Sequence, residues 1–173
     1  MTQTNKKIWF EIPFTGIEVR KRDVIRLNIV VPYTQWLKHN HLFADGSDAF
    51  VTFIRNPFDR VILQYEEQNR ERPAIMQYPM TFDSWCKASF DPNNIDPFIQ
   101  NNPKEFLSQK AWLEGSEGSM TIEKIDAGAS ETTYIKRIQK VVRSNYYSEE
   151  IAQLILSWYS EDFEMFNFDT HWK

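Results

Sequence analysis

The sequence is poor in cysteine and glycine, and it has no long apolar run: 173 residues include one cysteine and five glycines. A single cysteine, Cys86, excludes an internal disulfide, and no Cys or His ligand spacing around it predicts a zinc site, so buried packing is its expected role. No segment approaches the roughly 20 apolar residues that span a bilayer, and the N-terminus lacks the apolar core of a signal peptide. These absences predict a soluble, cytoplasmic protein without a metal or a membrane partner.

Positive charge is also in deficit. The chain carries 20 Lys and Arg against 24 Asp and Glu, for a formal net charge of −4, and its isoelectric point is near 5.4. An acidic surface argues against nucleic acid as a partner, because phosphate backbones select basic surfaces. Any site for an anion must therefore be a local pocket. The sequence does not indicate an oligomeric state.

Aromatic residues, in contrast, are abundant: six Trp, seven Tyr and thirteen Phe. This content is typical of a packed globule and excludes a disordered chain. A chain of this length buries about 70% of its unfolded surface as one unit. We therefore predict a single domain over residues 1–173.

The first half of the chain alternates strand and helix patterns. Asn56 is placed to cap a helix whose first turn contains Pro57 and which runs to about Arg72. The run at 24–31 is ambiguous, because periodicity does not separate a short strand from a buried helix. The other predicted elements are strands at 7–12 and 49–55, a helix at 33–43 and a loop at 44–48.

The second half is predicted to be mostly helical. A single helix over 148–166, beginning at Ser148, has acidic residues in its first turn, and its apolar residues recur at helical spacing. The other predicted elements are helices at 81–90, 103–115 and 130–142, and a strand at 119–125. Strands followed by helices predict an α/β fold in three layers, with a mainly parallel central sheet flanked by helices. Ligands of such sheets bind at the carboxyl ends of the strands, where Thr15-Gly16 and Arg55-Asn56 fall.

Several segments, taken in order, resemble one enzyme family. FIRNPFDRVILQY (53–65) is similar to the 3′-phosphate-binding motif of sulfotransferases, in the branch that acts on carbohydrates. KIWFEIPFTGI (7–17) resembles the strand and 5′-phosphosulfate loop that open that family. YPMTFDSW (78–85) and YYSEEIAQLILSWYSEDFEMFNFD (146–169) resemble its middle segment and its terminal helix.

This resemblance implies a P-loop-like sulfotransferase fold over nearly the whole chain. It also implies transfer of a sulfuryl group from 3′-phosphoadenosine 5′-phosphosulfate to a hydroxyl acceptor such as a sugar, without a metal. The partners would be a small nucleotide donor and a small acceptor. By the resemblance, Arg55 binds the donor's 3′-phosphate, and Thr15 and Gly16 belong to the 5′ loop.

Two of the family's most informative donor contacts are absent from this sequence. Phe14 replaces the loop lysine that supports the leaving phosphate, and Leu63 replaces a serine that joins the arginine on the 3′-phosphate. Arg20, Lys21 and Arg22, just after the loop, are candidate substitute cations. The alternative function is a catalytically impaired binding or interaction module on the same scaffold. A nucleotide kinase or phosphohydrolase is disfavoured, because the chain has no Gly-Lys-Ser/Thr triplet.

Some side chains have two interpretations. His39 and His41 lie between the two phosphate segments, and either is a candidate general base or a surface or capping histidine. Arg55 is expected to bind an anion, and the alternative is an ion pair with Asp59 or another carboxylate. Arg60 is interpreted as a charge on a helix surface.

Overall fold

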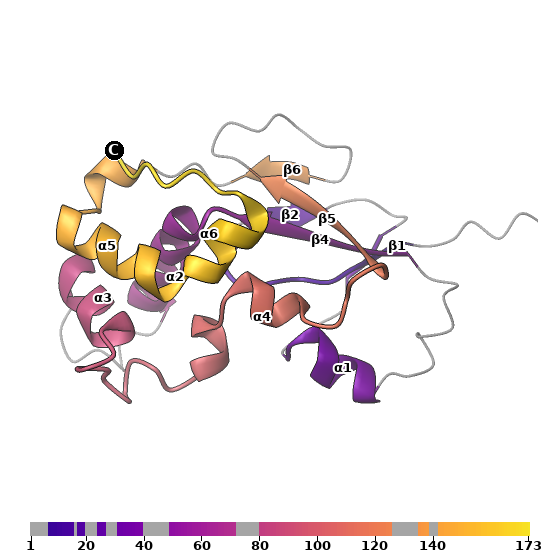
Figure 1. The fold of residues 1–173 in the computed structure, drawn as a ribbon, viewed down its shortest axis with the longest axis horizontal. Coiled ribbons are helices and arrows are strands. Elements are labelled where there is room, and N and C mark those ends of the chain that lie inside the picture. The colour runs from indigo at the N-terminus through magenta and orange to yellow at the C-terminus, as the bar shows by residue number, and fades with distance from the viewer. Residues whose placement is uncertain are drawn as a thin grey trace, which may run out of the picture. The chain divides into compact units, whose positions relative to one another are not determined.

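In the computed structural model the chain divides into two compact units (Figure 1). Unit 1 comprises residues 1–55 and 109–139, and unit 2 comprises residues 56–108 and 140–173. The structure describes residues 7–15, 17–19, 24–26, 31–39, 49–71, 80–125, 135–138 and 142–173. The predicted loop at 44–48 lies outside these residues. The prediction that the whole chain forms one domain stays a prediction.

Unit 1 is built on a four-stranded parallel sheet with the order β3-β1-β4-β5. Ile8 of β1 lies opposite Ile25 of β3 and Phe50 of β4. The strands are β1 (Lys7–Trp9), β3 (Val24–Arg26), β4 (Ala49–Arg55) and β5 (Met120–Ile125). The prediction of a mixed α/β protein with a parallel sheet is confirmed, and the first strand and the strand at 49–55 are parallel neighbours in that sheet.

The apolar sequence of β4 is explained by burial of both faces of the sheet. On one face, the ring of Phe50 lies 5.5 Å from that of Trp36 in α1 (Tyr33–His39). On the other, the ring of Phe53 lies 6.3 Å from that of Trp9 in β1. Because side chains alternate along a strand, only a continuous apolar run can fill both faces. Helix α4 (Gln109–Leu113) also belongs to unit 1.

A second, two-stranded sheet corrects the predicted helix at 130–142. β6 (Ile135–Ile138) pairs antiparallel with β2 (Ile17–Val19), with Ile17 opposite Ile138. The segment leading into β6 is rich in β-branched and aromatic residues, which favour a strand, and pairing with β2 decides between the two states. Residues 130–134 and 139–141 lie outside the described part.

Unit 2 contains helices and no strand among its described residues. Its core is aromatic: Trp85, Phe90, Phe106 and Tyr159 are each at most 2% exposed. The elements are α2 (Pro57–Glu71), α3 (Phe82–Phe90), η2 (Pro103–Phe106), η3 (Arg143–Asn145), α5 (Glu149–Trp158) and α6 (Ser160–Phe166). Cys86 is fully buried in α3, which confirms the packing role.

The predicted helix at 103–115 is wrong, because two elements replace it. The carbonyl of Phe106 accepts hydrogen bonds from Trp158 Nε1 (3.1 Å) and Tyr159 Oη (3.0 Å). The next carbonyl, of Leu107, accepts one from Arg60 Nη1 (2.9 Å). A continuous helix needs these carbonyls for its own ladder, so the side-chain bonds end η2 before α4 begins.

The C-terminal helix begins as predicted and is shorter than predicted. The Ser148 hydroxyl accepts a hydrogen bond from the Ile151 amide (3.4 Å) and caps α5. The helix breaks at Tyr159, whose φ of −106° and ψ of 26° are not helical, and α6 continues the chain. The buried ring and the bonded hydroxyl of Tyr159 hold the residue in this conformation. Among the described residues, no helix has the length and apolar character required to cross a bilayer.

Candidate functional site

The carboxyl edge of the parallel sheet in unit 1 is the first candidate site. From β1 the chain passes to β3 on one side, and β4 then takes the place on the other side of β1. The strand order therefore reverses between β1 and β4. Open parallel sheets bind ligands at such a reversal, outside the carboxyl ends of the two strands.

Arg55 and Thr15 meet at this edge, as the sequence predicted. Arg55 is the last residue of β4 and is fully buried, and its Nη1 donates a hydrogen bond to the Thr15 carbonyl (3.1 Å). The Thr15 hydroxyl in turn donates to the carbonyl of Ile12 (3.3 Å). The guanidinium is thus tied to the turn that follows β1.

Gln109 is a residue of this edge that the sequence did not reveal. It is the first residue of α4 and is fully buried. Its Oε1 accepts a hydrogen bond from the Arg55 amide (2.8 Å), and its Nε2 donates one to the Arg55 carbonyl (2.7 Å). A polar residue at a helix start usually faces solvent, so no local signal distinguishes this glutamine. Its role depends on a contact across 54 residues.

Phe14, where the family pattern has lysine, has a left-handed backbone. Its φ is 63°, and its side chain is half-buried. Such a conformation costs a residue with a Cβ atom roughly 1–2 kcal/mol. Among the described residues of unit 1, Phe14 is the only one other than glycine with a positive φ.

The structure does not describe the side chains of the other predicted site residues. Gly16, Arg20 and His41 lie outside the described residues. His39 is the last residue of α1, and its side chain also lies outside the described part. Their roles stay predictions.

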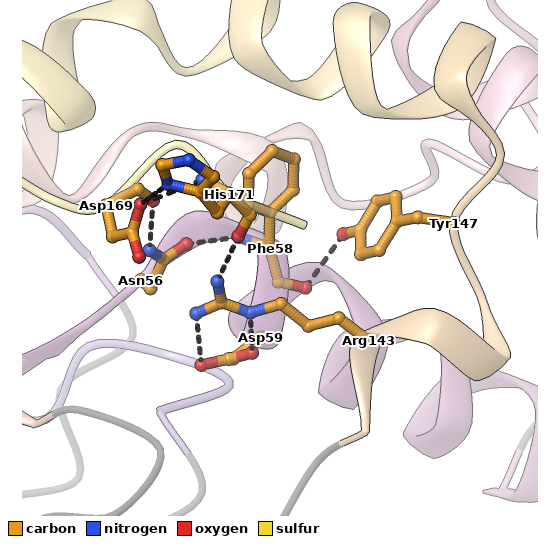
Figure 2. Close-up of polar contacts among 7 residues, drawn as sticks. All are labelled: Asn56, Phe58, Asp59, Arg143, Tyr147, Asp169 and His171. Atoms are coloured by element: carbon orange, nitrogen blue, oxygen red, sulfur yellow. Dashed lines mark hydrogen bonds and ion pairs between the residues drawn. The ribbon is translucent and has the colours of Figure 1, made fainter. Parts of the chain in front are cut away.

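A second polar cluster surrounds the start of α2 in unit 2 (Figure 2). Asn56 Oδ1 accepts a hydrogen bond from the Phe58 amide (3.0 Å), which confirms the predicted cap. Arg143 binds the fully buried Asp59 in a fork: Nε donates to Oδ1 (2.6 Å) and Nη2 donates to Oδ2 (3.0 Å). Burial has the largest single influence and lowers the pKa of Arg143, but the hydrogen bond to Asp59 and the negative charge of that carboxylate, with smaller contributions from neighbouring groups, together raise the pKa above its usual value, so Arg143 stays charged.

The C-terminal residues complete this cluster. Asn56 Nδ2 donates to the carbonyl of Asp169 (2.7 Å), and Arg143 Nη1 donates to the carbonyl of His171 (2.5 Å). Figure 2 shows both main-chain contacts beside the Asp59 fork. Tyr147 Oη donates to the Phe58 carbonyl (2.7 Å). These bonds satisfy the start of α2 within the protein, as expected of a structural cluster.

Two residues of α2 are buried, and one of them, Arg60, differs from its sequence interpretation. Arg60 is 1% exposed rather than a surface charge, and its guanidinium carbon lies 5.7 Å from the centre of the Tyr159 ring. Leu63, which the resemblance aligns with a phosphate-binding serine of sulfotransferases, is 5% exposed. Both side chains therefore contribute to packing.

Among the residues that the structure describes, no group of three or more His, Cys, Asp or Glu is arranged to hold a metal ion. Comparison of the chain with protein-family models, with curated proteins and with solved structures finds no match.

Proposed function

We propose that this protein binds the nucleotide of 3′-phosphoadenosine 5′-phosphosulfate at the carboxyl edge of its parallel sheet and transfers the sulfuryl group to a hydroxyl acceptor. The observation that carries the proposal is the meeting of Arg55 and Thr15 at the reversal of strand order. The two segments that resemble the family's donor-binding motifs thereby end at one edge, which one ligand would require. The fold that goes with this proposed function is a P-loop-like sulfotransferase fold.

Arg55 suits the 3′-phosphate for a physical reason. A guanidinium is permanently charged, carries five N–H donors and matches two phosphate oxygens at once. The hydrogen bond to the Thr15 carbonyl uses one donor and orients the fork. A buried cation on a rigid strand end binds a phosphate with little loss of side-chain entropy, because the side chain is already ordered.

The proposed reaction breaks the bond between the sulfur and the bridging phosphate oxygen, and forms a bond from the sulfur to the acceptor oxygen. The acceptor's proton passes to a base, for which His39 and His41 remain the candidates, and the nucleotide leaves as 3′-phosphoadenosine 5′-phosphate. Charge that develops on the leaving phosphate needs a nearby cation. Phe14 cannot provide that charge, and Arg20, Lys21 and Arg22 are the candidates that the sequence offers.

A binding module without turnover is the second candidate, and two observations favour it. Phe14 places an aromatic side chain in the turn after β1, and Leu63 is packed into the protein and offers no hydroxyl for a phosphate. One lost electrostatic contact at a transition state typically costs about 3–4 kcal/mol. Both candidates share the nucleotide site and differ in turnover.

One experiment separates them. The chain is incubated with 3′-phosphoadenosine 5′-phosphosulfate and a panel of sugar hydroxyl acceptors, and the released 3′-phosphoadenosine 5′-phosphate is measured. A parallel heat-denaturation series with that product detects binding, because a ligand of the folded state raises the melting temperature. Acceptor-dependent release supports the transferase, and a raised melting temperature without release supports the binding module. An unchanged melting temperature at millimolar nucleotide contradicts both.

A further inference from the structure

Gln109 makes an unusual contact at the end of β4. Its side-chain amide binds the main-chain amide and the main-chain carbonyl of the same residue, Arg55. Two hydrogen bonds to one residue are the pattern that a neighbouring parallel strand normally provides. Gln109 and Arg55 are both fully buried, so neither bond is exchanged easily for a bond to water.

The direction of these bonds shows which strand Gln109 replaces. The Val51 carbonyl of β4 accepts a hydrogen bond from the Phe10 amide, so the main-chain groups of Val51 face β1. Main-chain groups of alternate residues face the same side of a strand, and Arg55 is four residues after Val51. The amide and carbonyl of Arg55 therefore face the β1 side, where the chain has already turned at Pro13.

We propose that Gln109 is a positioning residue for the phosphate site. Its amide takes the place of the β1 residue that would continue the sheet, and it fixes the end of β4 from which the Arg55 guanidinium projects. The ends of β1 and β4 can then diverge at the reversal of strand order, because the amide and carbonyl of Arg55 keep their hydrogen bonds to Gln109. This inference rests on the proposed nucleotide site.

The test substitutes Gln109→Met, which keeps the length of the side chain and removes both hydrogen bonds. The first measurement is the ratio of affinities for 3′-phosphoadenosine 5′-phosphate and adenosine 5′-monophosphate, which isolates the contribution of the 3′-phosphate. We expect this ratio to fall roughly tenfold, because small misplacements of a binding group are costly.

The second measurement needs no ligand. Hydrogen exchange of the Arg55 amide is followed in each variant, and we expect it to accelerate about tenfold or more in Gln109→Met, because the amide loses its acceptor. Gln100→Met is the matched control: Gln100 Nε2 donates to the Ser89 carbonyl (2.6 Å) in unit 2. The Gln100→Met variant loses a hydrogen bond from a glutamine side chain to a main-chain carbonyl. Neither the affinity ratio nor the hydrogen exchange of the Arg55 amide should change in this variant.

The outcomes separate the two proposals. A wild-type protein that prefers the 3′-phosphorylated nucleotide, with the same preference in Gln109→Met, overturns the positioning role and leaves the proposed function standing. A wild-type protein without this preference overturns the proposed function. In that case unchanged exchange of the Arg55 amide in Gln109→Met also overturns the claim that Gln109 fixes the end of β4.

Discussion

The turn after β1 and the start of α2 are built in opposite ways. At the start of α2, Asn56 caps the helix, and Arg143 pairs with the buried Asp59. In the turn after β1, Phe14 adopts a left-handed backbone that favours glycine, and the Thr15 carbonyl is held by the Arg55 side chain. The first region has the residues that local stability requires, and the second does not. Substitutions should therefore damage folding at the start of α2 and change ligand binding in the turn after β1.

The largest expected effect is on the buried ion pair. Arg143→Met leaves the fully buried carboxylate of Asp59 without its forked partner, and such a change typically costs about 3–5 kcal/mol of unfolding free energy. Urea denaturation measures it. Lys87→Met is the control, because the Lys87–Glu150 pair is exposed (44% and 72%) and should contribute at most about 1 kcal/mol.

The double variant Asp59→Leu with Arg143→Met sharpens this prediction. Replacement of both charges by apolar side chains removes the unpaired carboxylate, so most of the lost stability should return. If Arg143→Met and Lys87→Met lose equal stability, the cluster of Figure 2 does not hold the start of α2.

A smaller effect is expected at Phe14. Phe14→Lys restores the cation of the family pattern at a half-buried position, and it should tighten binding of 3′-phosphoadenosine 5′-phosphate about tenfold by calorimetry, through one recovered charged contact. Phe14→Met is the control, because it replaces the aromatic ring with an unbranched side chain that carries no charge. Equal tightening by both variants would mean that relief of bulk, and not charge, is the cause. Leu63→Ser is a poor companion change, because loss of a buried leucine side chain typically costs about 2–5 kcal/mol.

The smallest effect concerns alkaline pH. Burial, and then the hydrogen bond from Tyr146 Oη to Glu66 Oε1 (2.6 Å), raise the pKa of Tyr146 from 10.0 to about 12. A pKa that is higher in the folded state gives stability that is complete below pH 10 and is lost as the pH rises toward 12. Tyr146→Phe should lower the unfolding free energy by about 1 kcal/mol at pH 8 and reduce its decline between pH 10 and 12.

Other tyrosines add to the loss of stability at alkaline pH. Tyr147 and Tyr159 are buried, and burial raises the pKa of each. Both therefore contribute a decline at alkaline pH that Tyr146→Phe retains. A decline that is as steep in Tyr146→Phe as in the wild type would contradict the raised pKa of Tyr146.

Local signals in the sequence predicted the elements that depend on local physics. The apolar run of β4, the Asn56 cap and the Ser148 cap were found, because each depends on neighbouring residues. The long-range contacts were not found. The break before α4 depends on side chains that bind the carbonyls of Phe106 and Leu107, and β6 depends on pairing with β2.

The candidate site divides in the same way. Arg55 and Thr15 were predicted, because each follows a recognisable strand and the ends of parallel neighbours meet at one edge. Gln109 and Arg143 were missed: their partners, Arg55 and Asp59, are 54 and 84 residues away in sequence. The strained backbone of Phe14 was also missed, because a phenylalanine gives no signal for a positive φ.

The central claim is that Arg55 belongs to a site for a 3′-phosphorylated nucleotide, and one calorimetric comparison tests it most directly. Wild-type protein is titrated with 3′-phosphoadenosine 5′-phosphate and with adenosine 5′-monophosphate, and Arg55→Gln, checked by circular dichroism to be folded, is titrated with both. A charged hydrogen bond contributes about 1.5–3 kcal/mol, so the wild type should prefer the 3′-phosphorylated nucleotide at least roughly tenfold, and Arg55→Gln should lose this preference. Equal affinity of the wild type for the two nucleotides, or a preference that survives in Arg55→Gln, would contradict the claim.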